Sequence, residues 1–396
     1  MFDAIDRRYM KKAIALAEKG LGLASPNPTV GCVIVRQGKN VGHGWHEYAL
    51  LDHAEARALR EASESSRGAT AYVTLEPCSH QGRTPPCAGR LIEAGIRRVV
   101  VAMMDPNPRV SGQGIRLLRS AGIRVDVGLM AEEAAKLIEP FACHITTLLP
   151  LVVSKVGMSL DGKIGTGRRE DMRISSAKGR EFGQYLRFLA DALLVGIGTV
   201  LTDDPELTYR GARAKARPLI RVILDSQLRT PPTARLFQAL PQAPVLIICK
   251  RGASQGRRRE LEKQGVEVVT VASSKNGLDL KAVLKELGRR DVLGLLVEGG
   301  SKVHWSFLSA KLVDKFYFIV APLVLGGRGY VTAVGGKGYE SVAQAPRFKI
   351  CGGFFAGSDV VLETYPAYSR SIFSPWLSSG ETPSGARDFL LSSRRI

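Results

Sequence analysis

Continuous apolar runs and amphipathic segments follow one another along the first 145 residues, a pattern that predicts strands and helices in turn. Four apolar runs rich in β-branched residues and bounded by turn signals are typical of buried strands. These runs lie at 30–35, 68–75, 98–103 and 123–127. Helices are predicted at 7–19, 54–62, 88–94, 115–120 and 131–144. Strands that alternate with helices at this rhythm predict a three-layer α/β sandwich.

From residue 151 the pattern starts again and predicts a second α/β domain. Its apolar strands are expected at 151–156, 192–197, 219–224, 245–248, 266–271, 293–297, 316–320 and 360–364. Helical segments are expected at 177–189 and 278–287. We therefore divide the chain into domains at 1–145 and 146–365. The Ser/Arg-rich stretch 366–396 shows no periodicity, and we expect a disordered tail there.

The most informative chemistry is the segment His53-Ala54-Glu55, followed by Pro77-Cys78 and by Cys87. One histidine and two cysteines can hold Zn²⁺ and leave its fourth position open, as a catalytic site requires. A glutamate that does not bind the metal can then move a proton from the attacking water to a departing amine. This set of residues is the known signature of zinc-dependent base deaminases. The second cysteine here follows the first by nine positions instead of three.

The predicted elements give this set a physical layout. Cys78 lies where the predicted strand 68–75 has given way to a loop. Cys87 precedes the predicted helix 88–94, whose N-terminal dipole would favour a thiolate. The alternative is that both cysteines are buried free thiols and that His53 is an ordinary surface histidine. Four residues in this order, bounded by a strand and a helix, favour the zinc site.

Composition is consistent with a cytosolic enzyme. The chain has 396 residues, 45% of them hydrophobic, which suits two globular domains. Its six cysteines lack the spacing of a disulfide framework, so a reducing cytoplasmic compartment is expected. No apolar run of 18 residues and no signal sequence is evident, so we expect neither a membrane span nor secretion.

The charge of +19 falls mainly on the second domain, since residues 1–145 carry only +4. Such an excess suits nucleic acid or a phosphorylated metabolite equally well. The densest cluster, residues 257–259, is followed at once by Glu260 and Glu262 and has no interleaved aromatic residues. We interpret it as a solvated helix face, and we expect no nucleic-acid partner.

Two glycine turns in the second domain could hold a nucleotide. The turn Gly299-Gly300-Ser301 leads from a predicted strand into a helical stretch, where exposed N–H groups can bind phosphate. Residues 325–329 form a second glycine turn that contains Arg328. Each could equally be a plain turn. No Gly-x-Gly-x-x-Gly motif opens a βαβ unit, so a standard Rossmann site is not supported.

Several motifs closely resemble the family of bifunctional riboflavin-biosynthesis deaminase/reductases. The resemblance covers about residues 1–365, and the long insertion between the cysteines makes it specific against other deaminases. In the first half it rests on PNPTVG at 26–31, HAE at 53–55, PCSHQGRTPPC at 77–87 and DPNP at 105–108. In the second half it rests on KVGMSLDGK at 155–163 and GTVLTDDPELT at 198–208.

The resemblance implies two successive reactions and two folds. A cytidine-deaminase-like first domain would hydrolyse the 2-amino group of 2,5-diamino-6-(5-phosphoribosylamino)pyrimidin-4(3H)-one. A second domain similar to dihydrofolate reductase would then use NADPH to reduce the ribosyl group to ribityl. Zn²⁺ and NADPH are therefore the expected cofactors. Relatives imply a homodimer or homotetramer.

The same resemblance implies residue roles. His53, Cys78 and Cys87 would bind zinc, and Glu55 would be the proton shuttle. The pyrimidine and phosphate pocket of the deaminase would be lined by Asn27, His46, His80, Arg83, Asp105 and Asn107, although His46 and His80 could equally be structural. In the reductase, the expected catalytic residues are Lys155, Asp203 and Glu298. NADPH would be held by Met158, Arg173, Thr199, Asp203, Gly300 and Ser301. The reductase substrate would be held by Asp171, Arg187, Leu207, Arg210 and Glu298, the arginines at its phosphate.

The sequence departs from the family pattern at several places. Arg173 stands where relatives usually carry the tryptophan that lines the cofactor site. Residues 49–52 replace a more usual Ala-Gly-Glu-Pro and remove a turn glycine, but no metal ligand.

Two other interpretations compete with this one. The first is a nucleobase or tRNA-adenosine deaminase with an accessory domain. The second is a monofunctional deaminase whose decayed second domain binds nucleic acid or a partner. The intact Lys155, Asp203 and Glu298 argue against decay.

Overall fold

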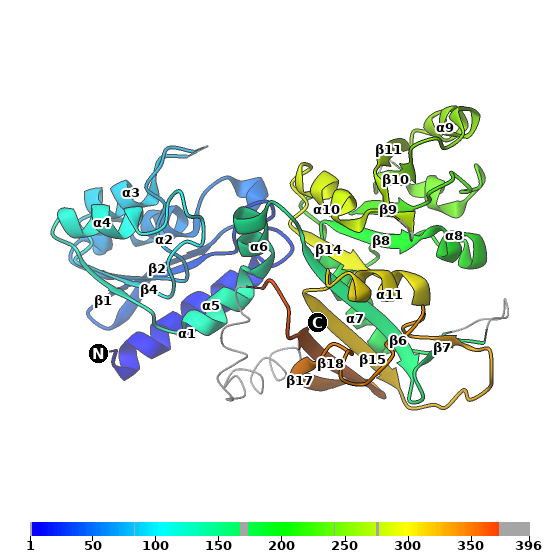
Figure 1. The fold of residues 1–396 in the computed structure, drawn as a ribbon. Helices are drawn as coiled ribbons and strands as arrows, with labels where there is room; N and C mark the ends of the chain where they lie inside the picture. The colour runs from blue at the N-terminus through cyan, green and yellow to red at the C-terminus, as the bar shows by residue number, and fades with distance from the viewer. Residues whose placement is uncertain (1, 83, 167–172, 241, 275–276, 372–396) are drawn as a thin grey trace. The chain divides into compact units, whose positions relative to one another are not determined.

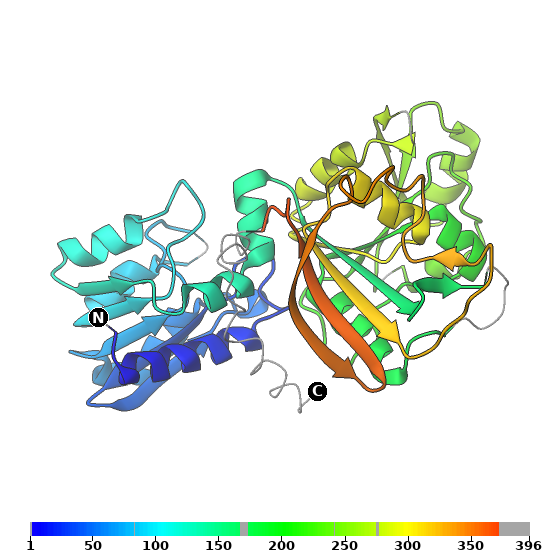
Figure 2. The same cartoon turned by 60° about the horizontal axis from the view of Figure 1, so that its bottom comes forward.

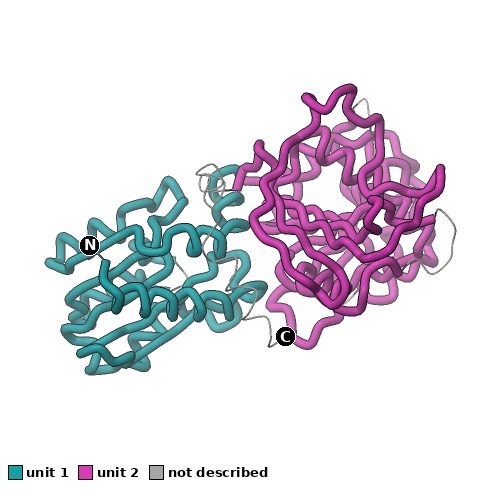
Figure 3. Tube along the Cα trace, turned by 90° about the horizontal axis from the view of Figure 1, so that it is seen from below, with its two compact units in different colours: residues 1–147 teal, residues 148–396 magenta. Residues whose placement is uncertain are grey.

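The computed structural model describes residues 2–82, 84–166, 173–240, 242–274 and 277–371. The chain divides into two compact units, residues 1–147 and 148–396, which are coloured separately in Figure 3. Each unit has its own sheet and is described by itself. No helix among the described residues is both long and apolar enough to cross a membrane.

The first unit is built on a five-stranded sheet in the order β2-β1-β3-β4-β5. β1 is antiparallel to β2 and β3, whereas β3, β4 and β5 are parallel. Its strands are β1 (Gly31–Arg36), β2 (Lys39–Trp45), β3 (Thr70–Val73), β4 (Arg98–Val101) and β5 (Arg124–Val127). Its helices are α1 (Ala4–Lys19), α2 (Ala54–Ala62), α3 (Cys87–Glu93), α4 (Gln113–Ser120), α5 (Ala131–Leu137) and α6 (Glu139–Thr147).

Helices cover both faces of this sheet, which confirms the predicted three-layer sandwich. In Figure 1, α1 and α5 lie on one face and α2, α3 and α4 on the other. Glycines let the helices approach the strands closely. A Cβ on Gly31 of β1 would lie 2.0 Å from the carbonyl oxygen of Ala13 in α1. On Gly42 of β2 it would lie 2.2 Å from the carbonyl oxygen of Ala58 in α2.

Two local predictions in this unit were wrong. The single helix expected over 131–144 is two helices, α5 and α6, because the backbone leaves helical geometry at Ile138 with a φ of −110°. Pro140 follows at the second position of α6, where the missing N–H is harmless but a continuous helix would lose a hydrogen bond. The strand β2 was missed because its glycines and polar residues hide the alternation.

The second unit contains a nine-stranded sheet in the order β11-β10-β9-β8-β14-β6-β15-β18-β17. The first seven strands in this order, from β11 to β15, are all parallel to one another. At one edge of the sheet, β18 pairs with β15 and β17 pairs with β18, both in antiparallel orientation. The large sheet is formed by β6 (Leu151–Ser159), β8 (Ala192–Gly196), β9 (Ile220–Leu224), β10 (Val245–Lys250), β11 (Glu267–Val271), β14 (Gly294–Val297), β15 (Lys315–Ala321), β17 (Phe348–Ala356) and β18 (Asp359–Pro366). Short pairs are formed by β7 (Lys163–Gly165) with β16 (Val331–Thr332), and by β12 (Ser273–Ser274) with β13 (Gly277–Leu278).

Alternate residues of the parallel strands point into two separate cores, one on each face of the sheet. Leu194 of β8 belongs to the core beneath α10 (Leu280–Gly288) and α11 (Ser301–Ser309). Leu193 belongs to the opposite core, with residues of α7 (Ala177–Leu189), α8 (Ile197–Asp203) and α9 (Gln255–Glu262). Figure 2 shows helices on both sides of this sheet. The predicted second α/β domain is therefore confirmed.

The packed part of this unit extends beyond the predicted limit at residue 365. β18 ends at Pro366, and Arg370 forms an ion pair with the buried Asp314, to whose Oδ1 its Nε donates at 2.8 Å. Ser371 is also buried. The first residues of the expected tail are thus ordered by these contacts, and the remainder, 372–396, lies outside the described residues.

Candidate functional site

The three predicted zinc ligands come from three separate elements of the first unit. His53 is the N-cap residue of α2, and Cys87 is the first residue of α3. Cys78 lies in the loop that follows β3. Because the parallel strands β3 and β4 end at the same edge, the loop after each strand reaches this site.

The ligand atoms of these residues lie within 4.8 Å of one another. His53 Nδ1 is 3.5 Å from the Cys78 sulfur and 3.3 Å from the Cys87 sulfur. Tetrahedral zinc with bonds to sulfur and nitrogen of ordinary length separates these ligand atoms by about 3.6 Å. The donor set and its spacing therefore fit a zinc ion without rearrangement.

Hydrogen bonds set the acidity of the two cysteines. Those from the Cys87 thiol and from His53 together lower the pKa of Cys78 to about 4, although burial opposes them. The hydrogen bond with Cys78, together with burial, raises the pKa of Cys87. The backbone N–H of Cys87 also donates to the Cys78 sulfur at 3.3 Å. Cys78 is therefore a preformed thiolate, ready to bind a cation.

Glu55 lies in the first turn of α2 and is buried, with 4% of its surface exposed. Burial and, to a lesser extent, the nearby Cys78 thiolate raise the pKa of its carboxyl group to about 7. A carboxyl group with a pKa near neutrality can both accept and return a proton under the same conditions. Its position and its acidity suit the proton shuttle that the sequence predicts.

His46 and Asn27 lie beside the zinc ligands. The ring of His46 contacts that of His53 edge to face, with centroids 5.3 Å apart. His46 Nδ1 lies 3.0 Å from the carbonyl oxygen of Asp52, and Nε2 lies 3.0 Å from the Asn27 amide nitrogen. Burial lowers the pKa of His46, so the ring is neutral: Nδ1 donates and Nε2 accepts. His46 thus orients Asn27, whose amide can contact a heterocycle.

The loop after β4 carries Asp105 and Asn107. Burial raises the pKa of Asp105, and the charges of Glu76, His80 and Cys78 also act on it. Its carboxylate accepts the backbone N–H of Asn107 at 2.8 Å. His80 is exposed, and Arg83 lies outside the described residues. The structure thus brings Asn27, His46 and Asp105 to the zinc ligands.

In the second unit, Lys155 and Glu298 form a partly buried ion pair on neighbouring strands. Lys155 is in β6 and Glu298 directly follows β14, and the two strands are paired in parallel. Lys155 Nζ is 3.4 Å from Glu298 Oε2. Although burial opposes ionisation, the charges of Arg187 and Lys155 lower the pKa of Glu298 to about 2. Glu298 is therefore a fixed negative charge.

Arg187 of α7, which is predicted at the substrate phosphate, contacts Glu298 and the segment at Thr208 within the chain. Its Nε and one terminal nitrogen donate to the two carboxylate oxygens of Glu298 at 3.0 and 2.7 Å. Its other terminal nitrogen donates to the carbonyl oxygen of Thr208 at 2.7 Å. The side chain is 13% exposed. Arg187 therefore holds Glu298 and the segment at Thr208 together, and its role at a substrate phosphate stays a prediction.

The remaining predicted reductase residues fall into three groups. Thr199 and Asp203 lie in α8, and a Cβ on Gly300 would come within 3.7 Å of the Thr199 hydroxyl, so α8 and the N-terminus of α11 meet there. Ser301 Oγ lies 3.3 Å from Thr332 Oγ1. Leu207 is buried, whereas Arg210 is exposed and its carboxylate partner Glu206 lies 3.6 Å away.

Met158 and Arg173 complete the predicted set. Met158 is half-buried against the core beneath α10 and α11. Arg173 is exposed, and Asp171 lies outside the described residues.

Sequence reasoning missed a buried pair beside Lys155. Ser154 Oγ and His304 Nδ1 are 2.8 Å apart, and both residues are fully buried. Burial, assisted by the charge of Lys155, lowers the pKa of His304 to about 4, so the ring is neutral. The pair joins α11 to β6. No sequence signal marks it, because the two residues are 150 positions apart.

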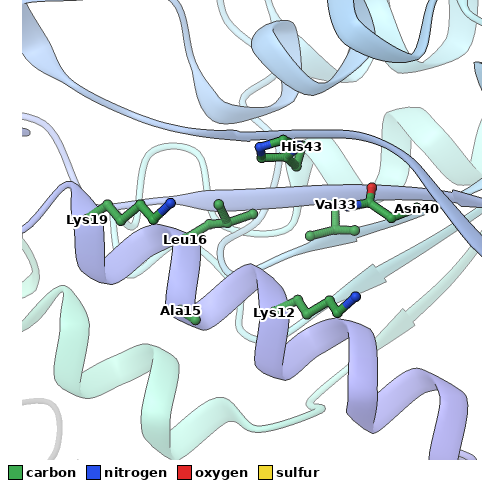
Figure 4. Close-up of a pocket in the computed structure, with 7 residues that line it drawn as sticks. All are labelled: Lys12, Ala15, Leu16, Lys19, Val33, Asn40 and His43. Carbon is green, nitrogen blue, oxygen red and sulfur yellow. The ribbon is translucent and has the colours of Figure 1, made fainter. Parts of the chain in front are cut away.

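A hollow of 240 Å³ outside both sites lies between α1 and strands β1 and β2 (Figure 4). Its lining is mainly hydrocarbon and includes none of the predicted site residues. It is formed by Lys12, Ala15, Leu16, Lys19, Val33, Asn40 and His43. The hollow offers no chemistry of its own for either reaction.

Both domains match known family models. Residues 3–103 match the model of the cytidine and deoxycytidylate deaminase zinc-binding region. Residues 150–362 match the model of the RibD C-terminal domain. The second match argues against the interpretation of a decayed second domain.

Relatives of known name match nearly the whole chain. The riboflavin biosynthesis protein RibD of Aquifex aeolicus is 42% identical over 87% of this chain and 94% of its own. RibD of Escherichia coli is 40% identical over 90% of this chain and 98% of its own.

Among solved structures, Acinetobacter baumannii RibD (form 1) is similar with a TM-score of 0.82 and 35% identity, covering 91% of this chain and 99% of that one. The diaminohydroxyphosphoribosylaminopyrimidine deaminase/5-amino-6-(5-phosphoribosylamino)uracil reductase of Thermotoga maritima is similar with a TM-score of 0.79 and 36% identity, covering 91% and 99%. With its zinc-binding deaminase region and its reductase domain, the chain belongs to the RibD family of bifunctional riboflavin-biosynthesis deaminase/reductases.

Proposed function

We propose that this protein first deaminates 2,5-diamino-6-(5-phosphoribosylamino)pyrimidin-4(3H)-one and then reduces its ribosyl group to ribityl. The observation that carries the first step is the set of three ligand atoms beside a buried glutamate. The observation that carries the second is the Lys155–Glu298 ion pair at the carboxyl end of β14, where Lys155 of the neighbouring strand β6 lies beside Glu298. Ligands of open parallel sheets bind at such ends.

In the deaminase, His53, Cys78 and Cys87 would hold Zn²⁺. When bound, this ion makes water nucleophilic near neutral pH. Glu55 accepts a proton from the attacking water and delivers it to the departing ammonia, which its pKa of about 7 allows. Asn27, Asp105 and Asn107 contact the pyrimidine through amide and carboxylate groups, and His46 keeps Asn27 oriented. His80 and Arg83 would contribute to the phosphate end of this pocket.

In the reductase, the N-terminus of α11 fits a dinucleotide phosphate. Gly300 caps this nine-residue helix without a side-chain hydrogen bond, so the first N–H groups of the helix can donate hydrogen bonds to an anion. NADPH would be held there by Gly300 and Ser301, together with Thr199, Met158, Asp203 and Arg173, and it supplies the reducing equivalent when bound.

The charges around Lys155 indicate which reductase residue donates a proton and which one positions the donor. Glu298 stays ionised over the working pH range because Arg187 and Lys155 face it. It therefore positions Lys155 instead of donating a proton. Lys155 is the group that can protonate the ribose ring oxygen as the sugar opens. Asp203 at the end of α8 is the second candidate acid, and Leu207 and Arg210 would contact the substrate.

The decisive experiment supplies the diamino-pyrimidinone ribosyl phosphate to the purified protein. Ammonia should be released without NADPH, and NADPH oxidation should begin when the cofactor is added. Ammonia without subsequent NADPH oxidation would leave a deaminase alone and would implicate Arg173. Absence of ammonia would refute the first step.

The proposal also covers the cellular compartment and the oligomeric state. We propose that the protein acts in the cytoplasm, because its cysteines are reduced and its substrates are phosphorylated metabolites. We also propose a homo-oligomer, a dimer or a tetramer. Light scattering of the purified protein would test this, and a monomeric mass would contradict it.

A further inference from the structure

Glu76 is a buried carboxylate that no role above uses. It follows β3 and comes two residues before Cys78, with 6% of its surface exposed. Its side chain accepts four backbone N–H groups. Oε2 accepts from Asp105 at 3.1 Å and from Gly112 at 2.8 Å. Oε1 accepts from Gly114 at 2.9 Å and from Ile115 at 3.3 Å.

These four donors explain why the position requires a carboxylate. The N–H groups at 114 and 115 belong to the first turn of α4, where a helix has no internal acceptors for them. Gly112, the N-cap residue of α4, has no side chain with which to satisfy them. An ionised carboxylate has two acceptor oxygens, no donor and a negative charge that suits a helix N-terminus. Glu76 thus caps α4 from a different part of the chain.

The same contacts fix the loop between β4 and α4 against the zinc-ligand segment. A Cβ on Gly114 would lie 1.9 Å from the carbonyl oxygen of Pro77, so α4 starts directly on the backbone that leads into Cys78. The loop then continues in small turns. Asp105 accepts the N–H of Asn107 at 2.8 Å, and Asn107 accepts that of Arg109 at 3.0 Å.

We propose that Glu76 is a positioning residue for substrate binding in the deaminase. By holding one end of the loop at Asp105 and the other at α4, it sets where Asp105 and Asn107 stand relative to the zinc ligands. It acts through these residues and does not touch the substrate. This inference rests on the proposed deaminase function.

The test is Glu76→Gln in the full chain, because an amide has nearly the same size. In either orientation of the amide, its NH₂ group replaces a carboxylate oxygen that accepts from two backbone N–H groups. These two hydrogen bonds are lost, and the NH₂ donor then faces two N–H donors. A loop displaced by about 1 Å is expected to lower kcat/KM for deamination about 100-fold. The loss should fall mainly on KM, because the zinc ligands and Glu55 are unchanged.

Three readouts separate positioning from general destabilisation. Zinc content by mass spectrometry should stay equal to that of the native protein, and NADPH oxidation by the second unit should be unaffected when the deaminated intermediate is supplied. The matched control is Asp6→Asn. Asp6 is equally buried in the same unit but on the opposite face of the sheet, where it accepts from Tyr72 and Arg98. This control should lower thermal stability and leave KM unchanged.

An unchanged KM in Glu76→Gln, or a loss of activity proportional to lost zinc, would overturn the proposal. Should that variant not fold, Glu76→Asp retains the charge on a shorter side chain; a raised KM with zinc retained is expected, and a native KM would refute the role. The native protein is assayed in parallel. Failure of its own ammonia release would instead refute the proposed function.

Discussion

Removing Arg187 should destabilise the second unit by an amount that the structure allows us to estimate. Its guanidinium donates to both oxygens of Glu298 in a buried site. The charges of Arg187 and Lys155 lower the pKa of Glu298 from 4.5 to about 2, despite burial. Each tenfold change in proton affinity is about 1.4 kcal/mol, so the pairing of the ionised carboxylate is worth about 3 kcal/mol.

Arg187→Met keeps much of the side-chain volume and removes the charge. Removing one partner of a buried ion pair costs about 3–5 kcal/mol, and the loss here should lie at the lower end of that range, because Lys155 still faces Glu298. The free energy of opening can be measured by hydrogen exchange in peptides that cover β14 and α7. The matched control is Arg180→Met on the same helix. Arg180 is exposed and donates to the carbonyl oxygen of Ser175, so its loss should cost less than about 0.5 kcal/mol.

The pH dependence gives the same reasoning a second test. Because folding lowers the pKa of Glu298, its contribution is complete above the unfolded value of 4.5 and is lost as the pH falls toward 2. Glu298→Gln should therefore flatten the stability of this unit in that window. A cost below about 1 kcal/mol for Arg187→Met at neutral pH, or an unchanged acid limb in Glu298→Gln, would refute the account.

The other predictions concern the division of labour between the two units. Glu55→Gln should keep zinc bound but lower the rate of ammonia release at least about 100-fold, because the proton shuttle is lost. Zinc analysis together with an ammonia assay checks this, and full activity would show that Glu55 is not the proton shuttle. Chelation of zinc should stop ammonia release and leave NADPH oxidation intact when the deaminated intermediate is supplied; loss of both would contradict separate sites. Arg173→Trp should leave deamination unaffected, whereas a collapse of ammonia release would show that the two halves are more strongly coupled than we propose.

The zinc ligands could be predicted from the sequence because the relevant signals are local. His53 and Glu55 are two residues apart at the start of α2, and each cysteine lies beside a recognisable boundary of an element. Continuous apolar runs rich in β-branched residues likewise located most strands of both sheets. These features depend on neighbouring residues, so a single sequence contains them.

The contacts that decide residue roles could not be predicted in this way. Arg187 and Glu298 are 111 positions apart, so nothing in the sequence shows that the arginine is held by a carboxylate. The four donors to Glu76 are backbone groups, which have no sequence signature. β2 was missed because it contains glycines, which do not mark a strand. They are needed there because α2 packs too closely for a side chain. Each of these features depends on which elements the fold brings together.

Two buried glutamates show how the fold assigns opposite roles to one residue type. Glu55 is buried beside the Cys78 thiolate, and its pKa rises to about 7. Glu298 is equally enclosed, but Arg187 and Lys155 face it and its pKa falls to about 2. The first can exchange a proton at neutral pH, and the second cannot. Glu298 is therefore unsuited to proton transfer in the reductase, which is why we propose that role for Lys155, held 3.4 Å from its carboxylate, with Asp203 as the second candidate.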